Sequence, residues 1–131
     1  EKQGTMAATS SSPSPVIVCS TEQEYHDAIK DAGEKLVVVD CYADWCGPCR
    51  FMAPIFEAMA LQYTNVVFIK VDVDKAPRIK NELGVWALPT FCFLKRGKKV
   101  GSVMGANEKN LRRGLENDGS VGVCSSCCIQ Q

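Results

Sequence analysis

The sequence predicts an α/β domain built on a mixed sheet, and three observations lead to this fold class. Apolar, β-branched runs that suit buried strands alternate along the chain with segments of helical periodicity. Arg96-Gly97 separates two further strand-like runs and is typical of a hairpin turn. The chain has 131 residues, enough for one domain with a sizeable core. We expect this domain over residues 16–118, a disordered leader over 1–15 and a flexible, Cys-rich tail over 119–131.

The first half of the domain is expected to form strand, helix and strand. Residues 16–19 are a short apolar run, and residues 20–24 offer cap and capping-box side chains. The helix that follows has its apolar residues on one face and a stop signal at Gly33. Residues 36–42 are almost all apolar, which favours a strand covered on both faces.

The second half is expected to add three helices and three strands. They are predicted at 46–63 (helix), 66–71 (strand), 74–83 (helix), 90–95 and 98–104 (strands) and from 107 to about 118 (helix). Asp74 and Asn107 are the expected helix caps, and Gly84 the expected end of the short helix. Crossover helices make the first three strands parallel, and the hairpin adds an antiparallel pair at one side.

Composition excludes several classes of function. Hydrophobic residues make up 46% and charged residues 23%, and 15 basic residues balance 15 acidic ones. This balance leaves no basic footprint for nucleic acid, and the apolar runs are too short to span a membrane. Since position 1 is not Met, residues before Met6 are expected to be a cloning remnant, with a removed signal or transit peptide as the alternative. Cysteines scattered through apolar segments favour a reducing compartment, the cytosol.

The segment ADWCGPCR, residues 43–50, carries the most specific chemistry. Its pair Cys46 and Cys49 is compatible with a metal clip, a structural disulfide or a redox switch. The second CxxC lies about 75 residues away, which does not suit a shared zinc site, so we expect no metal. A disulfide that closes so small a loop constrains the unfolded chain little. Cys46 at the start of a helix is expected to be a stabilised thiolate, and Cys49 one turn later can attack a mixed disulfide formed at Cys46.

Three neighbours of the pair are candidates for tuning or contact. Pro48 falls in the first helical turn, where its missing N–H costs little, and with Gly47 it restricts the linker between the sulfurs. Trp45 either shields the pair and offers a flat apolar contact to a partner, or is a core residue at the strand end.

WCGPC at a strand-to-helix turn resembles the active site of thioredoxins. The segments KLVVVDCYADWCGPCR, NVVFIKVDVDKAP, VWALPTFCFLKRGKKVG and MGANEKNL are similar to successive thioredoxin segments, so the resemblance covers roughly residues 16–117. The chain looks most like a eukaryotic cytosolic-type thioredoxin. The resemblance implies a three-layer α/β/α thioredoxin fold with a central mixed five-stranded sheet.

The resemblance also assigns roles to single residues. Asp40, in the middle of an apolar strand, matches a buried acid that helps to remove the proton from Cys49, rather than a loop cap. Lys70 matches a lysine that tunes this acid. Leu88 and Pro89 match a cis-proline segment whose backbone receives a substrate strand. The expected contact surface consists of Trp45, Gly47, Pro48, Leu88, Pro89, Gly105 and Ala106.

The implied function is that of a protein-disulfide reductase in cell redox homeostasis. Its redox group is a reversible Cys46–Cys49 disulfide, with no bound cofactor, and NADPH is used only through a flavin-dependent thioredoxin reductase. Other implied partners are disulfide-containing proteins such as peroxiredoxins or ribonucleotide reductase. We expect no nucleic-acid partner and no membrane span, and we expect the protein to be a monomer. A redox-dependent binding module and a disulfide oxidase or isomerase are the alternatives.

Some residues depart from the family pattern, and six cysteines lie outside the Cys46–Cys49 pair. Trp86, Ala87 and Cys41 are uncommon at their positions in the family pattern. Cys19, Cys41 and Cys92 lie in strand-like runs and are expected to be unreactive core residues. The tail holds Cys124, Cys127 and Cys128, and we expect it to be mobile and prone to oxidation. Lipid attachment at Cys128, palmitoylation, a regulatory disulfide or a third resolving thiol are the alternatives.

Overall fold

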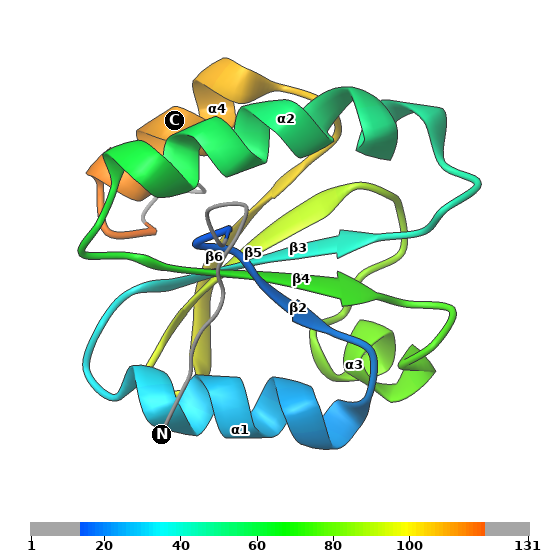
Figure 1. Cartoon of the computed structure of the whole chain (residues 1–131), viewed down its shortest axis with the longest axis horizontal. Helices are drawn as coiled ribbons and strands as arrows, with labels where there is room; N and C mark the ends of the chain where they lie inside the picture. The colour runs from blue at the N-terminus through cyan, green and yellow to red at the C-terminus, as the bar shows by residue number, and fades with distance from the viewer. Residues whose placement is uncertain (1–13, 120–131) are drawn as a thin grey trace, which may run out of the picture.

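The computed structural model describes residues 14–119, and they form a sheet between two layers of helices (Figure 1). The elements in chain order are β2 (Ile17–Cys19), α1 (Glu22–Ala32), β3 (Val37–Tyr42), α2 (Gly47–Gln62), β4 (Val67–Asp72), α3 (Pro77–Glu82), β5 (Thr90–Lys95), β6 (Lys98–Met104) and α4 (Glu108–Glu116). The predicted type and order of all nine elements are confirmed; the bounds of β5 and β6 are as predicted, and the ends of the other elements differ from the predicted ones by a few residues at most. The expected leader and tail fall largely outside the described residues.

The five strands form one sheet in the order β2-β4-β3-β5-β6. β2 and β3 both pair in parallel with β4, whereas β5 pairs antiparallel with β3 and with β6. The hairpin therefore lies at one side of the sheet, as predicted. The carboxyl ends of β3 and β4 meet at one edge, and β3 leads from there into the segment with Cys46.

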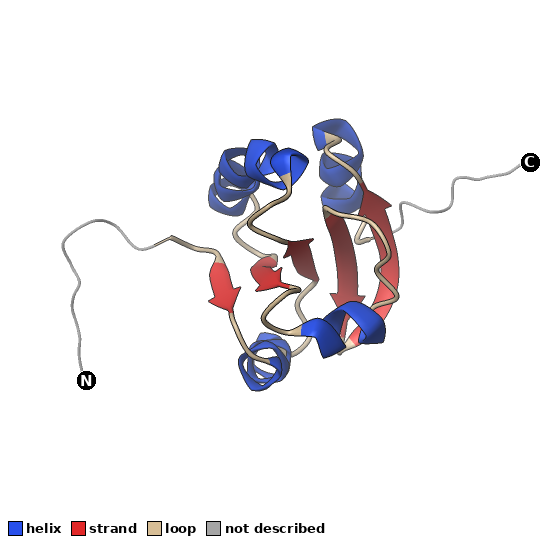
Figure 2. Cartoon of the chain, turned by 90° about the vertical axis from the view of Figure 1, so that its right-hand side faces the viewer, coloured by secondary structure: helices blue, strands red, loops and turns tan. Residues whose placement is uncertain are grey.

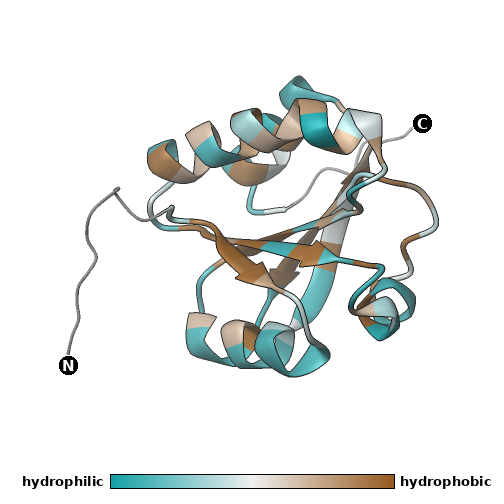
Figure 3. Ribbon diagram, turned by 45° about the vertical axis from the view of Figure 1, so that its right-hand side comes forward, coloured by the Kyte–Doolittle hydropathy of each residue, from teal (hydrophilic) through white to brown (hydrophobic). Residues whose placement is uncertain are grey.

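Helices cover both faces of the sheet, α2 and α4 on one side and α1 and α3 on the other (Figures 1 and 2). One core cluster joins Val37, Val39 and Cys41 of β3 to the side of α1 and α3. A second cluster joins Val38 to Met52 and Phe56 of α2 and to α4. Hydrophobic residues accordingly dominate the central strands in Figure 3. Because side chains alternate along a strand, Asp40 shares the face of Val38 and points to the α2 side.

The helix starts agree with the sequence at α1 and α4 but not at α3. Thr21 and Glu24 form the capping box of α1, and the Asn107 side chain accepts from the backbone N–H of Asn110 at α4. The prediction that Asp74 caps α3 is wrong. Ala76 occupies the N-cap position without a side-chain cap, and α3 starts with a proline that needs no backbone partner at this position.

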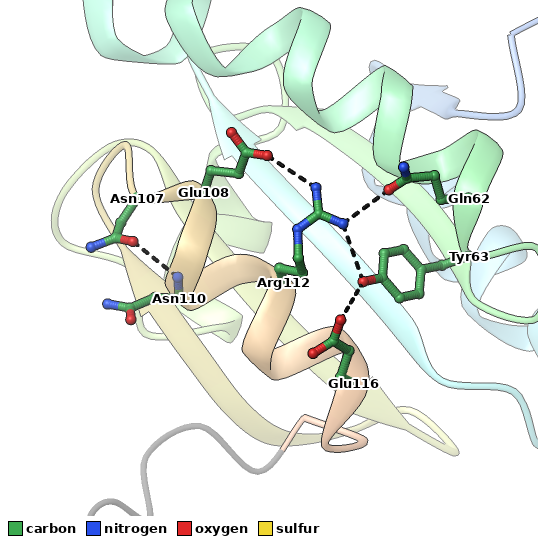
Figure 4. A network of polar contacts seen from close by, with 7 residues as sticks. All are labelled: Gln62, Tyr63, Asn107, Glu108, Asn110, Arg112 and Glu116. Atoms are coloured by element: carbon green, nitrogen blue, oxygen red, sulfur yellow. Dashed lines mark hydrogen bonds and ion pairs between the residues drawn. The ribbon is translucent and has the colours of Figure 1, made fainter.

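A polar network holds the end of α2 against α4 (Figure 4). Arg112 forms an ion pair with Glu108 at 3.0 Å and donates to Gln62 at 3.0 Å. The Tyr63 hydroxyl donates to Glu116 at 2.8 Å. These groups are largely exposed, so the buried Leu111 and Leu115 of α4, packed among the residues of the second cluster, provide most of the attachment. Within residues 14–119 no helix is long and apolar enough to cross a membrane.

Candidate active site

Cys46 and Cys49 form a disulfide at the start of α2. Cys46 is the N-cap residue of this helix, and Cys49 lies in its first turn, with 5.2 Å between the two Cα atoms. Both cysteines are only 4% exposed. The sequence predicts this position for the pair, and in the structure the two sulfurs are joined to each other as a disulfide.

The backbone around Cys46 favours a thiolate in the reduced state. The Cys49 backbone N–H donates to Cys46 Sγ at 3.2 Å, and the positive end of the helix dipole lies at the same place. The first turn of α2 contains no acidic residue that would oppose a negative charge. Pro48 stands where a helix has a spare backbone donor, so its missing N–H leaves no acceptor without a partner. The start of α2 is thus a position where backbone N–H groups and the helix dipole can stabilise a negatively charged sulfur.

Asp40 is a buried carboxyl on the α2 side of β3. It is 1% exposed, and its Oδ1 atom has no hydrogen-bond partner within the described part of the chain. Burial raises the pKa of Asp40 from 3.8 to about 7, and the opposing positive charge of Lys70 is too weak to cancel this shift. Lys70 is the register partner of Asp40 on β4, and its Nζ lies 4.5 Å from the centre of the Tyr42 ring.

A small cavity lies between Cys49 and Lys70, the register partner of Asp40. It has a volume of about 140 Å³ and is lined by Tyr42, Ala43, Asp44, Cys49, Arg50, Ala53 and Lys70. The cavity thus touches both Cys49 and the lysine paired with Asp40. Its size and the polar groups of Asp44, Arg50 and Lys70 in its lining can accommodate water.

Trp45 lies on the surface, so of its two interpretations the structure favours the partner contact over the core residue. Trp45 is 69% exposed, and its indole Nε1–H donates to Asp74 Oδ2 at 2.8 Å. Arg50 donates to the Asp44 carbonyl at 2.7 Å and so holds the same loop from its other side. Asp74, expected as a helix cap, instead fixes the orientation of the indole.

The segment before β5 contains the cis peptide bond Leu88–Pro89 that the resemblance implies. Thr90 Oγ1 donates to the Ala87 carbonyl at 2.6 Å, and the Gly105 N–H donates to the Pro89 carbonyl at 2.8 Å. The Pro89 carbonyl is therefore already paired. Among the described residues no hydrogen bond uses the backbone N–H or carbonyl of Leu88, which leaves these two groups open to a partner.

Gly105 and Ala106 follow β6 beside this segment. Gly105 has φ +87°, a conformation that a residue with a Cβ rarely adopts, and an added Cβ would meet no atom within 4 Å. The backbone conformation is therefore one reason for glycine at this position, and no residue within 14–119 fills the space beside it. Ala106 and the linker residues Gly47 and Pro48 are exposed.

Sequence reasoning missed the part that Asp74 and Trp86 play at this edge of the molecule. The sequence indicates a helix cap at Asp74, because this residue precedes a short helical segment. It marks Trp86 only as a residue that is uncommon in the family pattern. Both line one groove together with Trp45 and Leu88. For Asp74 the available signal is that its turn follows β4 at the edge where β3 leads to Trp45, whereas Trp86, between α3 and β5, follows no strand and has no such signal.

The other described cysteines are core residues, as predicted. Cys19, Cys41 and Cys92 are free and 0% exposed. Burial is the main factor that raises the pKa of Cys19 to about 11. A hydrogen bond with Cys92, together with burial, raises the pKa of Cys41. Cys124, Cys127 and Cys128 lie outside the described residues.

Comparison with known proteins identifies the family. The thioredoxin family model matches residues 16–117. Thioredoxin H5 of Arabidopsis thaliana is 46% identical over 106 residues, which cover 76% of this chain and 90% of the relative. Sus scrofa thioredoxin is 48% identical over 87 residues, which cover 66% of this chain and 83% of the relative. The crystal structure of thioredoxin NaTrxh from Nicotiana alata superposes with a TM-score of 0.77 at 40% identity and covers 85% of this chain and 98% of that chain.

The chain belongs to the thioredoxin family. Its fold is the thioredoxin fold, and its disulfide at the start of α2 is a redox-active centre. The protein is a thiol–disulfide oxidoreductase of the protein-disulfide reductase type, and it acts on disulfides of other proteins. Thioredoxins use this disulfide rather than a bound cofactor. Within the described residues, no group of three or more candidate ligands is arranged to hold a metal ion.

Proposed function

We propose that Cys46 is the nucleophile and Cys49 the resolving thiol of the reaction. The Cys46 thiolate attacks one sulfur of a partner disulfide, the partner's S–S bond breaks, and its electron pair leaves with the other partner sulfur. The resulting mixed disulfide joins Cys46 to the partner. Cys49 then loses its proton and attacks Cys46 Sγ, which releases the second partner thiolate and forms the Cys46–Cys49 disulfide. The observation that carries this assignment is the pair at the N-terminus of α2, with the Cys49 N–H directed at Cys46 Sγ.

Asp40 is the proposed proton acceptor for Cys49. Its pKa of about 7 makes it half ionised near neutral pH, so it can take a proton and give it back within each cycle. Its position on the α2 side of β3 and the cavity that touches Cys49 and Lys70 support a short path through water. Lys70 acts as a positioning and tuning residue, because its charge favours the carboxylate form of Asp40.

The proposed substrate surface surrounds the pair. Trp45 supplies a flat apolar contact, and the open N–H and carbonyl of Leu88 supply main-chain bonds to an extended partner segment. Gly47 and Pro48 restrict the linker between the two sulfurs. Pro89, Gly105 and Ala106 form the neighbouring part of the proposed substrate surface. There the Gly105 N–H already donates to the Pro89 carbonyl. Recognition through main-chain bonds makes little demand on the partner's sequence.

A flavin-dependent thioredoxin reductase that draws two electrons from NADPH is the proposed source of the dithiol. Peroxiredoxins and ribonucleotide reductase are the proposed classes of recipient. We assign the activity to the cytoplasm, because the free cysteines Cys19, Cys41 and Cys92 suit a reducing compartment. The protein is expected to act as a monomer.

Insulin reduction tests the whole scheme. Wild-type protein with NADPH and thioredoxin reductase should reduce insulin continuously, as followed by NADPH oxidation. The Cys49→Ser protein should stop after the first step and accumulate a mixed disulfide with insulin that non-reducing mass spectrometry detects. Wild-type protein that binds partners without turnover would instead favour a redox-dependent binding module.

A further inference from the structure

A groove of about 350 Å³ lies next to Trp45, between the active-site loop, α3 and the cis-proline segment. Its walls include Trp45, Asp74, Pro77, Lys80, Trp86 and Leu88. Leu88 also carries the open backbone groups of the proposed substrate surface. The groove is therefore continuous with the place where a partner's main chain would lie.

The groove presents two exposed indole rings. Trp45 is 69% and Trp86 is 75% exposed, which makes them the two most exposed large aromatic residues of the described chain. Exposed tryptophan is costly in water and is enriched at the centres of protein interfaces. Trp45 is held in place by its bond to Asp74, so it loses little freedom when a partner side chain packs on it.

The two charged residues of the groove, Asp74 and Lys80, differ in whether they already have a bonding partner. Asp74 already accepts the indole N–H of Trp45 and also lies in a turn that Asp72 holds by accepting the Asp74 N–H at 2.9 Å. Lys80 forms no ion pair with any carboxylate of residues 14–119. An incoming acidic side chain would find its counter-charge at Lys80, whereas a basic one would compete with Trp45 for Asp74.

We propose that this groove selects among disulfide-bearing partners. The favoured occupant is an extended segment beside the partner's reactive cysteine that carries an aromatic or large aliphatic side chain for Trp45 and Trp86 and an acidic side chain for Lys80. Main-chain bonds to Leu88 hold the segment without sequence demand, and the groove adds the selectivity. The inference rests on the proposed function, because the groove shares Trp45 and Leu88 with the proposed substrate surface.

A library of disulfide-linked peptide dimers tests the proposal directly. The three positions on either side of the single cysteine vary among Phe, Ala, Glu and Lys. Each reduction converts one dimer to two thiols while the reduced protein becomes oxidised, and kcat/KM is measured for every member. The wild-type protein should prefer peptides with Phe and Glu over those with Ala and Lys by about tenfold, the scale of one aromatic contact plus one ion pair.

Two variants locate the preference in the groove. Trp86→Ala should remove most of the discrimination between Phe and Ala, and Lys80→Glu should reverse that between Glu and Lys. As controls, Leu61→Ala changes an apolar residue on α2 that is 69% exposed, and Lys109→Glu changes an exposed basic residue on α4. Both variants should keep the wild-type preferences. Equal kcat/KM values across the library, or preferences that survive Trp86→Ala and Lys80→Glu, would overturn the proposal.

A binding measurement separates this proposal from the proposed function. The same peptides with Ser in place of Cys are titrated into the oxidised protein, and tryptophan fluorescence reports occupation of the groove. Tighter binding of the Phe and Glu peptides by about fivefold, lost in the Trp86→Ala and Lys80→Glu proteins, supports the groove even if no peptide is reduced. Identical dissociation constants for all peptides would refute it even if every peptide is reduced.

Discussion

Cys46 and Cys49 differ from Cys19, Cys41 and Cys92 far less in burial than in backbone surroundings. The first two are 4% exposed and the other three 0% exposed, so accessible surface hardly distinguishes the sets. The redox pair lies at a helix N-terminus, where spare N–H groups face a sulfur. The core thiols lie within strands β2, β3 and β5 rather than at the start of a helix. We therefore expect the nucleophilic thiolate at the start of α2, where unpaired backbone donors can stabilise it.

Removal of one thiol from each set should give the largest contrast. Cys46→Ser removes the proposed nucleophile, and we expect insulin reduction to fall by at least about a thousandfold, because serine is not ionised at neutral pH. Cys92→Ala leaves the helix start intact and should retain activity within about twofold, with a loss of about 1 kcal/mol in the free energy of unfolding. NADPH oxidation in the reductase-coupled assay gives the activities, and urea denaturation gives the stabilities. Loss of activity in Cys92→Ala without unfolding would contradict the comparison.

Asp40 extends the comparison to a buried carboxyl, because its burial on the α2 side of β3 shifts its pKa upward. The folded protein holds the Asp40 proton up to about pH 7, whereas the unfolded chain releases it near pH 4. The contribution of this group to the free energy of unfolding is therefore unaffected below pH 4, becomes increasingly unfavourable between pH 4 and 7, and is constant above. Asp40→Asn removes this pH-dependent cost. We therefore expect the difference in free energy of unfolding between the variant and the wild type to be more favourable to the variant at pH 8 than at pH 4, by up to about 4 kcal/mol.

Urea denaturation of both proteins from pH 4 to 8 measures this difference, and parallel stability curves would exclude a buried carboxyl with a raised pKa. The same variant tests the proposed proton transfer. Release of the second partner thiol should become slower in Asp40→Asn, and its rate should lose the rise around pH 7 that the carboxylate of Asp40 gives the wild type. A structural role alone would leave the shape of this pH profile unchanged.

Alkylation should separate the two sets of thiols without any mutation. In the reduced protein, we expect iodoacetamide to modify Cys46 at least about a hundredfold faster than Cys19, Cys41 or Cys92, since a strand thiol must wait for local opening and is not ionised. Peptide mass mapping reads each cysteine separately, so the thiols of the tail do not disturb the measurement. In 6 M guanidinium chloride all rates should become similar. Equal rates in the native protein would show that position in the fold does not control reactivity.

The sequence predicts the elements well because each has a local cause. The run over β3 requires cover on both faces, Thr21 and Glu24 form their capping box within four residues, and Arg96-Gly97 turns the hairpin. The position of the redox pair follows from the same local reasoning. The order of the parallel strands does not, because hydrophobic runs specify burial but not which neighbour lies on which side.

The environment of Trp45 is the part of the site that sequence reasoning could not supply. Its contact with Asp74 joins residues 29 positions apart in two separate turns, and no periodicity links them. Asp74 was therefore assigned to the helix that follows it. The cis bond at Pro89 is similar, since a Leu-Pro pair is compatible with both isomers and only the family resemblance indicated it.

The smallest expected effect lies at the other end of α2, away from both sets of cysteines. Tyr63→Phe removes the hydroxyl that donates to Glu116 and accepts from Arg112 at 3.4 Å. Because these partners are largely exposed and water can replace the bond, we expect a loss of only about 0.5 kcal/mol in the free energy of unfolding and no change in insulin reduction. Urea denaturation and the coupled assay measure the two quantities on the same samples. A clear loss of activity would mean that the packing of α2 against α4, and not only the start of α2, controls the redox pair.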